Sequence, residues 1–170
     1  MMTAMIMLFL LFSSAVAQSL VPPVELLVQA KTPFLLGAVI YYALARSGRV
    51  MLIFALAAGI MHDALSAIPM GYSALWFVLI GAGINRSRDV IIGESPLTAA
   101  LLGGIFGIAF VFATYASLKL AGEAVGPLAW WQLTLKAAGT GGLGMIVAPA
   151  LFVVAGRVEQ WLGTARRKAA

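Results

Sequence analysis

The sequence has no cysteine, a single histidine and very few charged residues. The absence of cysteine excludes disulfides, thiolate metal ligands and cysteine nucleophiles, and one histidine cannot build a multi-histidine metal site within one chain. Charged residues make up only 10% of the 170 residues, whereas hydrophobic residues make up 62%. With a mean hydropathy of +1.02, the chain has too little polar surface to cover a soluble globule. We therefore predict an integral membrane protein.

The formal net charge of +5 does not indicate nucleic-acid binding, because the basic residues lie at the ends of the apolar segments. The sequence also lacks an HExxH motif, a cluster of paired carboxylates and a serine or lysine in a nucleophile-like context. We therefore expect no enzymatic activity, no metal and no cofactor. A chain of this length has room for one helical bundle, so residues 1–170 are predicted to form a single transmembrane domain.

Six apolar segments predict an all-α bundle of six transmembrane helices joined by short loops. Thr32-Pro33 and Ser95-Pro96 are helix-start signals, because Ser or Thr can accept a hydrogen bond from a free backbone N–H and proline suits the first helical position. The third and fourth segments flank a short turn and should form a tight hairpin. The predicted helices cover residues 3–21, 32–45, 50–65, 70–84, 96–121 and 132–155.

The first segment has a second interpretation. Ala15 and Ala17, just before Gln18, resemble the small-residue cleavage site of a signal peptide. However, no Lys or Arg precedes the apolar stretch, so the positive region typical of a signal peptide is missing. We expect this segment to be retained.

The basic residues predict the orientation of the bundle. Alternate connections between the segments carry eight and three of them, so the positive-inside rule places the richer set, and with it both termini, in the cytoplasm. The turn between the third and fourth helices then faces outward. The richer set is Arg46, Arg49, Arg86, Arg88, Arg157, Arg166, Arg167 and Lys168; the poorer set is Lys31, Lys119 and Lys136.

Small and aromatic residues predict where helices pack and where they meet the interface. Glycines at 103, 104 and 107 should allow close helix approach, as should those between Gly139 and Gly144, which have neither the strand nor the Lys-Ser/Thr pair of a phosphate loop. Trp130-Trp131 and Tyr41-Tyr42 are typical of an interfacial aromatic belt.

The most informative stretch places His62 and Asp63 inside an apolar run. A carboxylate within a bilayer costs about 2.5 to 3.5 kcal/mol on insertion scales, so Asp63 must find donors such as backbone N–H groups of the Ser66 turn, or Tyr72 and Ser73. Its position near the external face should also let it reach headgroups or water. Neighbours in a helix point about 100° apart, so His62 and Asp63 should not form one site without another helix.

The residues around Asp63 resemble the Gly-x-x-x-Asp-x-x-Ser-x-x-Pro-x-Gly-x-x-Ala-Leu signature of the rod shape-determining protein MreD family. The matching positions are Gly59, Asp63, Ser66, Pro69, Gly71, Ala74 and Leu75. The resemblance extends over about residues 31–90 and includes Pro33 and the basic residues that follow the second and fourth helices. We expect the motif residues from Gly59 to Ala74 to have a structural or partner-binding role.

This resemblance implies a non-enzymatic scaffold in the bacterial inner membrane, within the cell-elongation complex that guides lateral peptidoglycan synthesis and rod shape. The implied partners are the single-span protein MreC, the MreB filament, and the RodA glycosyltransferase with its transpeptidase. A cytoplasmic basic group should attract anionic lipid or acidic partner surfaces. It comprises Arg86, Arg88, Arg166, Arg167 and Lys168.

Two other functions fit a small helical membrane protein. The first is the substrate-binding S component of an energy-coupling-factor vitamin transporter, which would need an external pocket. Its possible polar anchors are Asp63, His62, Tyr72, Tyr115 and Trp130. The second, a proton-coupled carrier using Asp63, is less favoured because a single acid near the surface makes a poor path across the bilayer.

Overall fold

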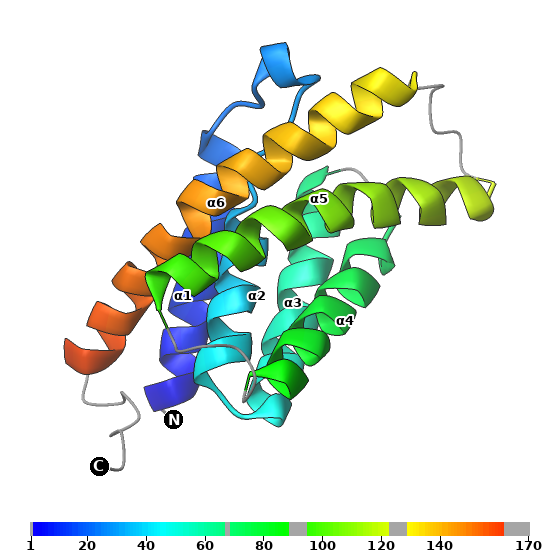
Figure 1. The fold of residues 1–170 in the computed structure, drawn as a ribbon. Helices are drawn as coiled ribbons and strands as arrows, with labels where there is room; N and C mark the ends of the chain where they lie inside the picture. Colours follow the sequence, from blue (N-terminus) through cyan, green and yellow to red (C-terminus); the bar gives the residue numbers. More distant parts are fainter. Residues whose placement is uncertain (1, 67–68, 89–94, 123–128, 162–170) are drawn as a thin grey trace.

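The computed structural model describes residues 2–66, 69–88, 95–122 and 129–161, and this part of the chain is helical, as predicted. It has no strand within these ranges, only an isolated bridge between Val24 and Ala30. The elements are α1 (Met2–Leu20), the short 3-10 helix η1 (Glu25–Leu27), α2 (Phe34–Ala45), α3 (Gly48–Ser66), α4 (Tyr72–Ser87), α5 (Pro96–Leu120) and α6 (Trp130–Trp161). In Figure 1, α1 to α4 stand side by side, and α5 and α6 cross their front face.

Three of these helices are long and apolar enough to cross a membrane by length and composition: α3, α5 and α6, with 19, 25 and 32 residues. Met5–Leu20 and Phe34–Ala45 are shorter apolar helices. By this criterion, three of the six predicted membrane spans are supported. The predicted end of the last helix at Ala155 is wrong, because α6 continues to Trp161.

Helix α2 forms the centre of the bundle. All ten residues from Leu35 to Leu44 are buried, and α2 contacts each of the other five α-helices. A helix that is hydrophobic on all sides is typical of such a central position. Tyr41 and Tyr42 therefore do not lie in an interfacial belt as expected; Tyr42 stacks on Phe54 of α3 with ring centroids 4.1 Å apart. Trp130 and Trp131, in contrast, are exposed.

The 12 residues of α2 span only about 18 Å, well short of a hydrocarbon core of about 30 Å. Its terminal backbone groups therefore need partners inside the protein. At its start, the Leu35 N–H donates to Gln18 Oε1 of α1 at 3.3 Å. At its end, Asn85 Nδ2 of α4 donates to the carbonyls of Ala43 and Arg46, at 2.8 and 3.0 Å.

The start of α2 differs from the prediction. Pro33 is the N-cap residue rather than the first helical residue, and no side chain caps the helix locally. Gln18, seventeen residues earlier in the chain, supplies the acceptor instead of Thr32. Ser95 does cap α5 as predicted, since its side chain accepts a hydrogen bond from the Thr98 N–H.

Helices α5 and α6 pack through their glycines, as the sequence predicts. A Cβ atom on Gly103 would overlap the carbonyl of Gly144, and one on Gly107 would lie 3.0 Å from the Cα of Gly141. The glycines between Gly139 and Gly144 lie within the uninterrupted helix α6, which agrees with packing and not with a phosphate loop.

The outer surface of the bundle carries large apolar side chains on all the helices except α2. In a soluble protein this much contiguous apolar surface would favour aggregation, whereas in a membrane lipid tails can cover it. The fold therefore agrees with the membrane protein that the composition predicts. Examples from α1, α3, α5 and α6 are Phe9, Ile53, Ile105 and Ile146.

Candidate functional site

Asp63 lies near the end of α3 and caps the start of α4. Its side chain is fully buried, and its two carboxylate oxygens accept hydrogen bonds from the backbone N–H groups of Gly71 at 2.8 Å and Ser73 at 3.0 Å. Gly71 is the N-cap residue of α4 with a φ of 111°, a left-handed conformation that favours glycine, and it has no side chain to cap the helix. The Asp63 carboxylate of α3 therefore caps the start of α4 in place of a local side chain.

The position of Asp63 at the N-terminal end of α4 also has an electrostatic consequence. A helix N-terminus carries a partial positive charge, so a buried carboxylate is stabilised there. Ser73 is one of the predicted donors, and Gly71 lies at the end of the turn that follows Ser66. The expectation that Asp63 reaches headgroups or water is wrong, because its exposed fraction is 0%. This enclosure leaves Asp63 no exposed surface for direct contact with another molecule.

His62 joins the same arrangement through α4. Its Nδ1 atom lies 3.0 Å from the hydroxyl oxygen of Ser73, the residue whose backbone N–H binds Asp63. The two adjacent side chains of α3, which diverge along the helix, are thus linked by one residue of the next helix, as the 100° argument requires. His62 also packs edge-on against the ring of Phe110 from α5, at 5.3 Å between centroids.

The remaining motif residues shape the hairpin. A Cβ atom on Gly59 would overlap the backbone of Ala74, so glycine at this position allows α3 and α4 to touch one turn below Asp63. Ala74 is buried, and Pro69 and Gly71 are exposed in the turn. Ser66 is the last residue of α3, and its hydroxyl is buried without a hydrogen-bond partner in the described part of the chain. Ala67 and Ile68 lie outside the described residues.

The opposite end of the bundle holds an ion pair that the sequence did not reveal. Arg46, after α2, lies 2.7 Å from the carboxylate of Glu159 on α6, and Glu159 is only 4% exposed. The predicted end of the last helix at Ala155 leaves Glu159 outside that helix. The available signal was the apolar spacing of Val158 and Trp161, which continues the helix past Arg157.

The predicted cytoplasmic basic residues have different environments. Arg86 is exposed in the last turn of α4. Arg88 is half-buried and donates to the carbonyl of Arg46 at 3.2 Å, so it helps to cap the end of α2. Its side chain is therefore not fully available to lipid or to a partner surface. Arg166, Arg167 and Lys168 lie outside the described residues.

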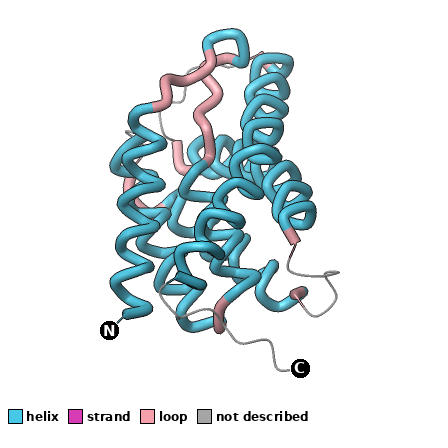
Figure 2. The backbone as a smooth tube through the Cα atoms, turned by 90° about the vertical axis from the view of Figure 1, so that its left-hand side faces the viewer, coloured by secondary structure: helices cyan, strands magenta, loops and turns pink. Residues whose placement is uncertain are grey.

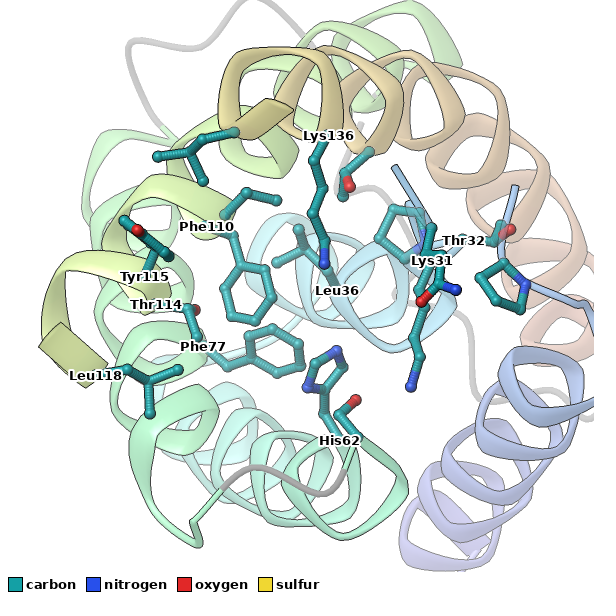
Figure 3. Close-up of a pocket in the computed structure, with 17 residues that line it drawn as sticks. Lys31, Thr32, Leu36, His62, Phe77, Phe110, Thr114, Tyr115, Leu118 and Lys136 are labelled. Atoms are coloured by element: carbon teal, nitrogen blue, oxygen red, sulfur yellow. The ribbon is translucent and has the colours of Figure 1, made fainter. Parts of the chain in front are cut away.

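A cavity of about 330 Å³ lies at the Asp63 end of the bundle, between the loop before α2 and helices α3 to α6. In Figure 3, Lys136 extends from α6 into this cavity, and His62 faces it from α3 beside Phe77 and Phe110. Asp63, Tyr72 and Trp130, three of the anchors considered for a vitamin pocket, are not part of the lining. Its polar lining includes Lys31, His62, Ser66, Thr114, Tyr115 and Lys136.

Within the described ranges, no group of three His, Asp or Glu side chains is placed to hold a metal ion. Fold and site together define a helical membrane protein in which the motif acid holds two helices in a hairpin.

Comparison with known proteins agrees with this class. The family model described as rod shape-determining protein MreD matches residues 1–148, so the chain belongs to the MreD family. The match reaches well beyond residues 31–90 and includes α1, α5 and more than half of α6. No curated protein and no solved structure gives a significant match. Membership of this family assigns the protein to the determination of rod shape.

Proposed function

We propose that this protein is a non-enzymatic scaffold in the bacterial inner membrane, which supports the cell-elongation complex and lateral peptidoglycan synthesis. The observation that carries the proposal is the use of the motif acid: both carboxylate oxygens of Asp63 accept backbone N–H groups of α4. A catalytic or proton-carrying acid needs access to its substrate or to water, whereas this one is fully enclosed. The family match adds the connection with rod shape.

In this proposal all six α-helices cross the bilayer, with both termini in the cytoplasm. Figure 1 shows the start of α1 and the end of α6 at the lower end of the bundle, and Figure 2 shows the loop that carries η1 at the other end. Arg46 and Arg88 meet at the first end, and Lys31 and Lys136 line the cavity at the second. The short helix α2 is compatible with a membrane, because Gln18 and Asn85 satisfy its terminal backbone groups.

Reporter fusions test this topology. An alkaline phosphatase fusion after Ala170 should be inactive, because the enzyme is active only outside the cytoplasm, and a fusion at Ala67 should be active. An active fusion at Ala170 would overturn the proposed orientation.

The expected partners follow from the family. They are a single-span protein of the MreC type, the MreB filament on the cytoplasmic side, and the RodA and transpeptidase pair. Exposed apolar residues near the turn of the hairpin, Leu65, Met70 and Leu75, provide a surface against which a single-span helix could pack. At the other end, Arg86 is exposed and suited to anionic lipid.

Co-purification tests the scaffold proposal. Asp63→Ala should reduce recovery of the MreC-type partner from membranes and should make rod-shaped cells round. The reason is that the two hydrogen bonds from Asp63 of α3 to the start of α4 are lost. Ser87→Ala is the control, because Ser87 is exposed in the last turn of α4, at the other end of that helix from Asp63. If Asp63→Ala, expressed at the wild-type level, binds the partner fully and supports rod growth, the proposed role of the hairpin is wrong.

One observation favours a second candidate, the S component of a vitamin transporter: the cavity at the proposed external end, which includes His62 and Tyr115. Under this alternative, the purified protein binds a vitamin and co-purifies with an ATPase and a coupling subunit. In addition, Asp63→Ala lowers ligand binding without changing cell shape. The family match favours the scaffold.

A further inference from the structure

The cavity beside the hairpin has a composition that the scaffold function does not use. Two lysines from separate parts of the chain reach it: Lys31 from the loop before α2 and Lys136 from the second turn of α6. Among the described residues that line it, none is acidic. Within the same part of the chain, neither ammonium lies within 4.0 Å of a carboxylate, and Lys31 Nζ donates only to the carbonyl of Leu65 at 3.3 Å.

Charges of one sign in a membrane protein are costly unless an opposite charge or water accompanies them. Hydroxyl groups accompany the two lysines here. Thr114 is only 7% exposed, and its hydroxyl has no hydrogen-bond partner in the structure as described; the same holds for the Ser66 hydroxyl. Two cations and two unsatisfied hydroxyls thus surround one space, which is the donor set that an anion with several oxygens requires.

The other walls of the cavity are apolar. It is lined from α4 and α5 by Phe77, Phe110, Val111 and Leu118, and Figure 3 shows the rings of Phe77 and Phe110 next to each other, to one side of Lys136 and His62. The exposed Trp130 lies six residues before Lys136, about 9 Å along α6, and such a tryptophan is typical of the membrane interface. A position of Lys136 near the level where lipid headgroups meet acyl chains agrees with this spacing.

We propose that this cavity binds one anionic phospholipid, with its headgroup phosphate between Lys31 and Lys136 and the first part of an acyl chain along Phe77 and Phe110. A volume of about 330 Å³ holds a headgroup and part of one chain. In this proposal the remainder of the lipid extends through the open side of the cavity into the bilayer. The bound lipid connects the loop before α2 with α3 to α6. This inference is independent of the proposed function, because the binding needs no partner protein.

Native mass spectrometry of the full-length protein, stripped of lipid in a neutral detergent, tests the proposal. Phosphatidylglycerol should bind at one copy per chain. Glycerol phosphate, which lacks the tails, and diacylglycerol, which lacks the phosphate, should each bind at least about tenfold more weakly. Equal binding of glycerol phosphate would identify a site for a soluble phosphate compound. Equal binding of diacylglycerol would identify a non-specific apolar pocket. Either result overturns the proposal.

Variants locate the site. Lys31→Gln and Lys136→Gln should each weaken phosphatidylglycerol binding by about tenfold or more, since each removes a charge-assisted hydrogen bond. Lys136→Arg should retain binding, which would show that the loss in Lys136→Gln comes from the missing charge and not from a change in the fold. Lys119→Gln is the matched control, because Lys119 is exposed and does not line the cavity. Wild-type binding by both glutamine variants would refute the site. Loss of lipid binding with normal partner recovery would leave the scaffold proposal intact.

Discussion

Replacement of Asp63 is the sharpest test of how the hairpin is held together. In Asp63→Ala, the N–H groups of Gly71 and Ser73 lose their acceptor. Ser73 is fully buried, so its unpaired N–H should cost about 1 to 3 kcal/mol, whereas Gly71 is exposed and loses only the net value of a hydrogen bond, about 0.5 to 1.5 kcal/mol. We expect a total loss of about 1.5 to 4.5 kcal/mol.

Asp63→Asn should be milder. The amide keeps one acceptor oxygen, so one of the two hydrogen bonds survives, but the favourable interaction of the carboxylate with the N-terminus of α4 is lost. We expect a loss of about 1 to 2.5 kcal/mol, less than for alanine.

Thermal unfolding of the detergent-purified protein measures the difference. A loss of 1 kcal/mol corresponds to roughly 2 to 4 °C in a chain of this size, so the order of Tm values should be wild type, then Asp63→Asn, then Asp63→Ala. Ser87→Ala should stay close to wild type, because Ser87 is exposed at the other end of α4. The reasoning is refuted if Asp63→Ala and Asp63→Asn are equally stable, or if Ser87→Ala costs as much as Asp63→Ala.

Three further predictions concern other parts of the bundle. Gly59→Ala should lower Tm by several degrees, because its Cβ would overlap the backbone of Ala74, whereas Gly83→Ala, with open space around its Cβ, should be neutral or stabilising. Glu159→Leu should cost up to about 3 kcal/mol in chemical unfolding, because Arg46 loses the carboxylate that lies 2.7 Å away, and the cost of the double variant with Arg46→Met should be smaller than the sum of the two single costs; additive costs would contradict this. Intact-mass analysis should find the first segment attached, because Ile6, Leu10 and Leu11 of α1 are buried in the core, and a mature start at Gln18 would show that most of α1 is removed.

Several features of this protein follow from local sequence alone. The apolar composition predicts the membrane protein, and the proline and glycine signals locate most helix ends within a few residues, because they act on the backbone next to them. The motif around Asp63 predicts the hairpin, since Gly59, Pro69 and Gly71 have short-range steric roles. Even the closeness of α5 and α6 follows from their glycines.

Other features depend on residues that are distant in the sequence. The pairing of Arg46 with Glu159 joins positions 113 residues apart, and the early predicted end of the last helix concealed it. Local rules also assign the cap of α2 to Thr32, whereas the structure uses Gln18 of another helix.

Tertiary structure alone decided how the polar groups are used. The sequence shows that Asp63 needs donors, but only the packing of α3 on α4 encloses both of its oxygens and keeps it from water. The tertiary structure also brings Lys31 and Lys136 to one cavity, although in the sequence each resembles an ordinary interfacial lysine. The physical reason is that hydrophobicity and backbone preference are properties of a residue and its neighbours. Burial, hydrogen bonding and charge pairing, in contrast, depend on which helices meet.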